Sequence, residues 1–104
     1  MVKYSRYNSL ERKLKMKSVI TVTGKDTKGI IAKVSTRCAD FGANIVDISQ
    51  SVLQDYFAMM MLVEIDELSI SFGDFVDELR LLGEQNGLLI QAMHEDIFNS
   101  MHRI

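Results

Sequence analysis

The sequence contains no proline, no tryptophan and a single cysteine among its 104 residues. One thiol cannot form a disulfide within the chain, so a scaffold held together by internal disulfides is excluded, and we expect a cytoplasmic protein. No stretch approaches the roughly 20 apolar residues that a membrane-spanning helix requires, and residues 1–17 lack an apolar run of signal-peptide length. We therefore expect no membrane partner.

Positive charge is scarce outside the first residues of the chain. Residues 1–17 contain six Lys or Arg and one acid, whereas residues 18–104 contain six bases and thirteen acids. An acidic body is poorly suited to a phosphate backbone, so we expect no nucleic-acid partner. The length fits one core, and we divide the chain into a flexible basic extension, residues 1–15, and a single domain, residues 16–104.

The first part of this domain predicts a strand, a loop and a helix. The β-branched run 19–23 forms the strand. Asp26 or Thr27 caps the helix, and Gly29 belongs to its first turn. The apolar stripe of the helix consists of Ile31, Val34, Cys38 and Phe41, and Gly42 supplies the left-handed stop.

Residues 44–65 predict a β-hairpin with a polar turn at Gln54 and Asp55. The first strand, residues 44–53, has apolar residues at even spacing, namely Val46, Ile48 and Val52. The second strand, residues 56–65, is apolar on both sides, because Phe57, Met59, Met61, Val63 and Ile65 alternate with Ala58, Met60 and Leu62. One side faces the core, and the other requires a cover, either the terminal helix or a second subunit.

The remaining sequence predicts a helix, a fourth strand and a short terminal helix. Ser71 and Asp74 form a capping box for a helix that buries Phe72, Phe75, Val76, Leu79 and Leu82 and ends near Asn86 and Gly87. Residues 88–93 form the strand, and Asp96 caps a helix that presents Ile97, Met101 and Ile104 on one side. With right-handed crossovers, the order βαββαβ predicts an α+β, ferredoxin-like fold: a four-stranded antiparallel sheet with two helices on one face.

The loop before the first helix is the candidate binding site. A helix N-terminus offers unpaired N–H groups and partial positive charge to a ligand carboxylate. Gly29 removes a Cβ where a ligand would approach, Asp26 can accept an ammonium group, and Asn44 offers both a donor and an acceptor. Helix capping, helix packing and turn formation explain the same three residues without a ligand.

Other candidate sites lack essential residues. The spacing from Gly24 to Gly29 imitates a phosphate-binding loop, but Ile30 and Ile31 replace the required Lys and Ser or Thr. His94 and His102 are too far apart in sequence for a typical metal-ligand pair. Cys38 is on the apolar stripe and is expected to be a buried structural thiol. We therefore expect no catalytic residue, metal or cofactor.

Several segments together resemble the ACT domain family, and the likeness extends from about residue 16 to residue 104. The matching segments are Thr23–Gly24, the loop 25–29 leading into 30–34, the turn 41–45, and 93–98. The chain is most similar to the small single-domain ACT proteins related to glycine-cleavage regulators. The resemblance implies a non-catalytic regulatory domain that binds a small molecule, often an amino acid, between the first loop and a neighbouring subunit.

The resemblance also assigns residues to the binding site. The loop acid of the family falls on Asp26, its helix-opening glycine on Gly29 and its asparagine on Asn44, whereas Lys28 replaces a proline found in many relatives. The expected ligand-binding residues are Gly24, Lys25, Asp26, Lys28, Gly29, Ile30, Asn44 and Ile45. We expect a homodimer that controls a separate protein. The alternatives are a protein-binding adaptor without a ligand, or an acylphosphatase-like hydrolase using Lys25 or Lys28 as its cationic anchor.

Overall fold

The computed structural model describes residues 15–25 and 28–102. Its elements are, in order, β1 (Lys17–Lys25), α2 (Ile30–Asp40), β2 (Asn44–Leu53), β3 (Tyr56–Glu64), α3 (Phe72–Asn86), β4 (Leu88–His94) and α4 (Glu95–Met101). The predicted βαββαβ order with a terminal helix is confirmed. Of the basic extension expected over residues 1–15, only Lys15 lies inside the described part of the chain.

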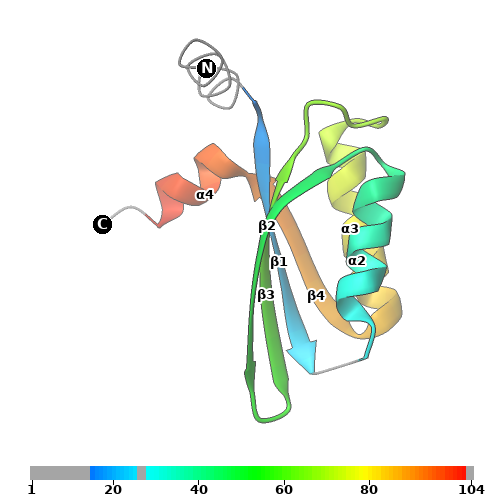
Figure 1. Cartoon of the computed structure of the whole chain (residues 1–104), viewed down its shortest axis with the longest axis vertical. Coiled ribbons are helices and arrows are strands. Elements are labelled where there is room, and N and C mark those ends of the chain that lie inside the picture. The colour runs from blue at the N-terminus through cyan, green and yellow to red at the C-terminus, as the bar shows by residue number, and fades with distance from the viewer. Residues whose placement is uncertain (1–14, 26–27, 103–104) are drawn as a thin grey trace, which may run out of the picture.

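The four strands form one antiparallel sheet in the order β2-β3-β1-β4. Strand β1 is central, and its Val22 lies opposite Met59 of β3 and Ile90 of β4. Helices α2 and α3 cover one face of this sheet, whereas α4 extends from the other side (Figure 1). This arrangement confirms the ferredoxin-like fold and divides the molecule into a helix-covered face and an open face.

The hydrophobic core lies between the sheet and the helices α2 and α3. Its most buried side chains are Ile20, Val22, Met59, Met61 and Val63 from the sheet, and Val34, Cys38, Phe75 and Leu79 from the helices. The predicted alternation along β3 is confirmed, because Met60 is exposed and Leu62 is half-buried on the opposite side from Met59 and Met61. Burial of such large apolar side chains is the main stabilising contribution to the fold.

The beginning of helix α2 differs from the prediction. The helix starts at Ile30 after Gly29, which is the N-cap, so Gly29 is not in the first turn and the predicted cap at Asp26 or Thr27 is wrong. Both predicted capping residues lie outside the described part of the chain. Because side chains on a helix rotate by about 100° per residue, Ile30 rather than Ile31 faces the core.

The exit from helix α2 is as predicted. Gly42 has a φ of 84°, in the left-handed region, and a Cβ there would overlap the carbonyl oxygen of Glu67. Glycine is therefore required at this position by both conformation and space.

A β-bulge changes the pattern expected along β2. The register against β3 shifts between Ile45 and Asp47, so Val46 is an extra residue in the bulge and is exposed. Ile45 and Ile48 pack against the core instead. The expected placement of Val46 on the same side as Ile48 and Val52 is wrong, because one inserted residue reverses the alternation of sides along a strand.

The two C-terminal helices begin in different ways. The Ser71 hydroxyl accepts a hydrogen bond of 3.1 Å from the Asp74 N–H, which confirms the predicted cap of α3, and Gly87 ends that helix with a φ of 67°. Phe72 and Val76 of α3 are only half-buried. Helix α4 follows β4 directly, with His94 as its N-cap, so the predicted cap at Asp96 is wrong. Ile97 and Met101 of α4 are exposed, and Ile104 lies beyond the described residues.

Candidate functional site

The N-terminus of helix α2 is not capped by any side chain from the described residues. Gly29 precedes it with a φ of 80°, and no acid occupies the first turn. The first N–H groups of the helix therefore combine hydrogen-bonding capacity with the partial positive charge of the helix end. A Cβ on Gly29 would meet no atom within 4 Å, so glycine is needed here for its backbone conformation and not to make space.

A hollow of about 550 Å³ opens beside this helix end. One wall is the run from Lys28 to Ala32, and the other is formed by Gln50 and Val52 of β2 with Phe57 of β3. The hollow therefore combines an apolar wall with backbone N–H groups, the Lys28 ammonium group and the Gln50 side-chain amide. This combination suits a small ligand that has an anionic end and an apolar part.

Lys28, Gly29 and Ile30 are the members of the predicted binding set that line this hollow. Gly24 borders a different hollow, on the open side of the sheet near the β2–β3 turn. Lys25 is exposed at the end of β1, and Asp26 lies outside the described residues. The first loop therefore contributes to the hollow mainly through its last residues.

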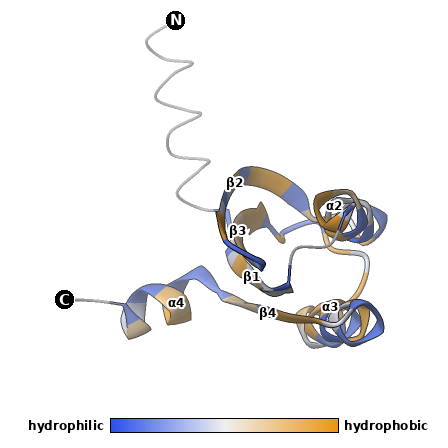
Figure 2. Ribbon diagram, turned by 90° about the horizontal axis from the view of Figure 1, so that it is seen from below, coloured by the Kyte–Doolittle hydropathy of each residue, from blue (hydrophilic) through white to orange (hydrophobic). Residues whose placement is uncertain are grey.

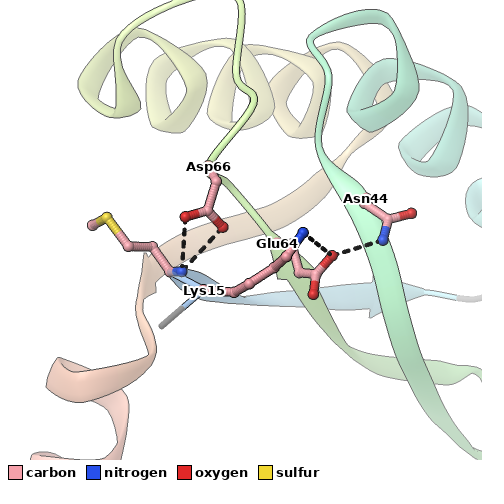
Figure 3. A network of polar contacts seen from close by, with 5 residues as sticks. Lys15, Asn44, Glu64 and Asp66 are labelled. Atoms are coloured by element: carbon pink, nitrogen blue, oxygen red, sulfur yellow. Dashed lines mark hydrogen bonds and ion pairs between the residues drawn. The ribbon is translucent and has the colours of Figure 1, made fainter. Parts of the chain in front are cut away.

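Asn44 and Ile45 are at the opposite end of α2. The helix contains 11 residues, which corresponds to a length of about 16 Å. The Asn44 side-chain amide donates a hydrogen bond of 2.9 Å to Glu64, which also lies 4.0 Å from the Lys15 ammonium group (Figure 3). Ile45 packs against the core. Within one chain, the structure does not bring these two residues to Gly29.

The network around Asn44 also holds the start of the described chain. Asp66 accepts hydrogen bonds of 3.1 Å and 3.0 Å from the Met16 N–H through its two carboxylate oxygens (Figure 3). The Ile65 N–H in turn donates to the Met16 carbonyl oxygen. These contacts fasten the beginning of β1 to the end of β3, which is a structural role.

Gln50 and Val52 are lining residues that the sequence prediction did not include. Both are on the same side of β2 as Ile48, because the strand alternates regularly after the bulge. The signal available from sequence was this even spacing from Ile48. It became informative only when β2 was known to be the strand beside the helix N-terminus.

The titratable side chains considered above do not form a reactive or metal-binding centre. Cys38 is fully buried, and desolvation raises the pKa of its thiol from 9.0 to about 11. His94 packs its ring on Phe72 and His102 stacks on Phe98, with ring centroids 4.4 Å and 4.1 Å apart. Within residues 15–25 and 28–102, no group of three or more His, Cys, Asp or Glu is placed to hold a metal ion. In the same residues no helix is long and apolar enough to cross a membrane.

Comparison with known proteins gives matches over nearly the whole described chain. The ACT domain family profile matches residues 17–93. A UPF0237 protein from Methanopyrus kandleri is 46% identical over 88 residues, which cover 85% of this chain and 98% of the relative. The structure of an ACT domain protein from Streptococcus pneumoniae is 43% identical, with a TM-score of 0.71 over 81% of this chain and 94% of that chain.

A regulator is also among the similar structures. A putative glycine cleavage system transcriptional repressor is 30% identical and has a TM-score of 0.65, and the match covers 78% of this chain and 46% of the repressor chain. The residues matched by the ACT profile include the helix end and both walls of the hollow beside it.

Proposed function

Since the chain belongs to the ACT domain family, and within it to the UPF0237 group of small ACT proteins, we propose that it is a non-catalytic regulatory module that binds an amino acid. ACT domains are typically regulatory and bind small molecules. The observation that carries the proposal is the hollow of about 550 Å³ at the N-terminus of α2.

The hollow offers complementary groups to the carboxylate and to the side chain of an amino acid. The ligand carboxylate accepts hydrogen bonds from the first N–H groups of α2 and is attracted by the helix dipole and by Lys28. The ligand side chain lies against Val52 and Phe57, and the Gln50 amide provides a polar contact from the same wall. Apolar and amide-bearing amino acids fit these groups better than basic ones, because Lys28 repels a second positive charge.

A second copy of the chain completes this site in the proposed homodimer. Strand β2 is an edge strand, and Val52 is eight positions after Asn44, which corresponds to about 26 Å along the strand. If two β2 strands pair antiparallel around a two-fold axis, the beginning of one lies beside the end of the other. The partner's Asn44 then lies beside the part of β2 that carries Gln50 and Val52, and it contacts the ligand when its side chain turns away from Glu64.

Ligand binding is proposed to change the affinity of the dimer for a separate regulated protein. No catalytic residue or cofactor is assigned. The hydrolase alternative requires a fixed cationic anchor for a phosphate group. Lys25 and Lys28 are the candidates for that anchor, and both are exposed. The adaptor alternative requires no occupied hollow at all.

A thermal-shift screen of the twenty amino acids tests the proposal. A ligand at a hundred times its Kd stabilises the folded state by about 2.7 kcal/mol, which gives a clear shift in Tm. We expect the response to be confined to one or a few amino acids. A flat response to all twenty contradicts ligand binding and favours the adaptor, whereas turnover of a small acyl phosphate that is lost in Lys28→Ala favours the hydrolase.

A further inference from the structure

The open face of the sheet is only partly covered by the described chain. Helices α2 and α3 lie on the other face, and α4 leaves the sheet at one end and extends away from it (Figure 2). A hollow of about 270 Å³ lies between α4 and the sheet, where Phe98 approaches Val19 and Leu62. Toward the β2–β3 turn, at the other end of the strands, no described helix covers this face.

The uncovered end carries large apolar side chains. Leu53, Tyr56 and Leu89 are 74%, 61% and 57% exposed, although all three belong to strands. Leu53 lies opposite Tyr56 in the β2–β3 ladder, and Leu89 is in the row of Thr23 and Ala58. Leu53 and Tyr56 also border a hollow of about 350 Å³ at this end. We refer to Leu53, Tyr56 and Leu89 together as the bare end of the open face.

Helix α4 presents a matching apolar surface that has no contact with the bare end of its own chain. Ile97 and Met101 are four residues apart, so they are on the same side of the helix, and they are 53% and 65% exposed. The seven residues of α4 span about 10 Å, which equals the usual separation of about 10 Å between two stacked sheets. A helix of this length can therefore reach from one sheet to a second one.

We propose that two copies of the chain stack open face to open face with their strands antiparallel, so that α4 of each copy covers the bare end of the other. The contact is self-complementary, as a two-fold interface requires. A large side chain has on the order of 150–200 Å² of surface, so Met60, Ile97, Met101 and the bare end expose roughly 600 Å². These side chains lie in two separate areas of one copy, and their sum is most of the about 800 Å² per partner of a standard interface.

This interface is distinct from the β2 edge used in the proposed ligand-binding dimer. The edge of the sheet and its open face point in different directions, so one two-fold axis cannot serve both. Used together with perpendicular, intersecting two-fold axes, the two contacts give a closed assembly of four chains. The open-face contact does not depend on ligand binding, because the hollow beside α2 is on the helix-covered side of the sheet.

Sedimentation equilibrium of the full chain tests the inference with three charge-introducing variants. Met101→Glu changes α4 and Leu89→Glu changes the bare end, and each is expected to reduce four chains to two. Leu81→Glu is the matched control, because Leu81 is an exposed apolar residue of α3 in the other layer, and it is expected to remain at four. Circular dichroism verifies that each variant is folded.

The outcomes separate this interface from the one at the β2 edge. One outcome is a wild type with the mass of two chains that falls to one chain in Met101→Glu and Leu89→Glu. This result supports the open-face contact and excludes pairing through the β2 edge. An unchanged mass in both variants, or a monomeric wild-type chain, overturns the open-face contact. The amino-acid thermal shift is expected to persist in Met101→Glu, so loss of this interface and absence of ligand binding are observed separately.

Discussion

Asn44 and Glu64 face each other at the end of the β2–β3 ladder, and the Asn44 Nδ2 donates a hydrogen bond of 2.9 Å to the Glu64 Oε1. This contact is at the far end of α2 from Gly29. Asn44 therefore has a structural role within its own chain. Any contact between Asn44 and the proposed ligand must be with a ligand bound beside Gly29 of a second subunit. The two roles make different predictions.

Asn44→Ala is expected to lower the affinity for the amino acid that gives the largest shift in the screen by about tenfold, the equivalent of one hydrogen bond of about 1.4 kcal/mol. Isothermal titration calorimetry measures this change. Glu64→Ala is the matched control, because it removes the same intrachain hydrogen bond and keeps Asn44. An equal loss of affinity in both variants would mean that Asn44 acts only through the sheet.

Gly29→Ala and Gly87→Ala form a second matched pair. Both glycines have a positive φ, of 80° and 67°, and a Cβ on either meets no atom within 4 Å. Each substitution is expected to reduce the free energy of unfolding by about 1–2 kcal/mol, as measured by urea denaturation. Only Gly29→Ala should also weaken the response to the amino acid, because it shifts the first N–H groups of α2. Equal ligand responses would place the binding site elsewhere.

Cys38 should make stability depend on pH in the alkaline range. Burial raises the pKa of its thiol from 9.0 to about 11, so the unfolded chain loses this proton at lower pH than the folded chain. The contribution of Cys38 is fully present below pH 9 and is lost as the pH rises to about 11. The expected loss is on the order of 2 kcal/mol.

The measurement is urea denaturation of the wild type and of Cys38→Ala at about pH 8 and about pH 11. The difference in unfolding free energy between the two proteins should decrease at the higher pH. A difference that does not change with pH would show that the thiol titrates normally and is accessible to solvent.

The order of the elements was predictable because each carries a local signal. Alternation along β3 predicted which methionines are buried, and Ser71 and Gly87 predicted the ends of α3. The errors occurred where the signal is weak or the backbone inserts a residue. The bulge at Val46 reverses the side-chain alternation. Helix α2 is capped at Gly29 and not at Asp26 or Thr27, and Ile30 rather than Ile31 faces the core.

The candidate site was predictable only in the part that is continuous in sequence. Lys28, Gly29 and Ile30 belong to one helix end, and the chemistry of that end follows from local structure. Gln50 and Val52 join them through the register of an edge strand, which local pattern does not contain. Asn44 is near Gly29 in the sequence but separated from it by the length of α2.

The sequence by itself determined the fold class, the buried side of β3 and the helix end that can attract an anion, because hydrophobic spacing and glycine positions act over a few residues. Tertiary structure alone decided which wall faces that helix end, where α4 goes and which apolar surface stays uncovered. These properties depend on strand order and register, which are set by contacts between residues far apart in the chain. The sequence indicated that one side of β3 needs a cover, and the structure showed that the described part of α4 leaves most of that side open.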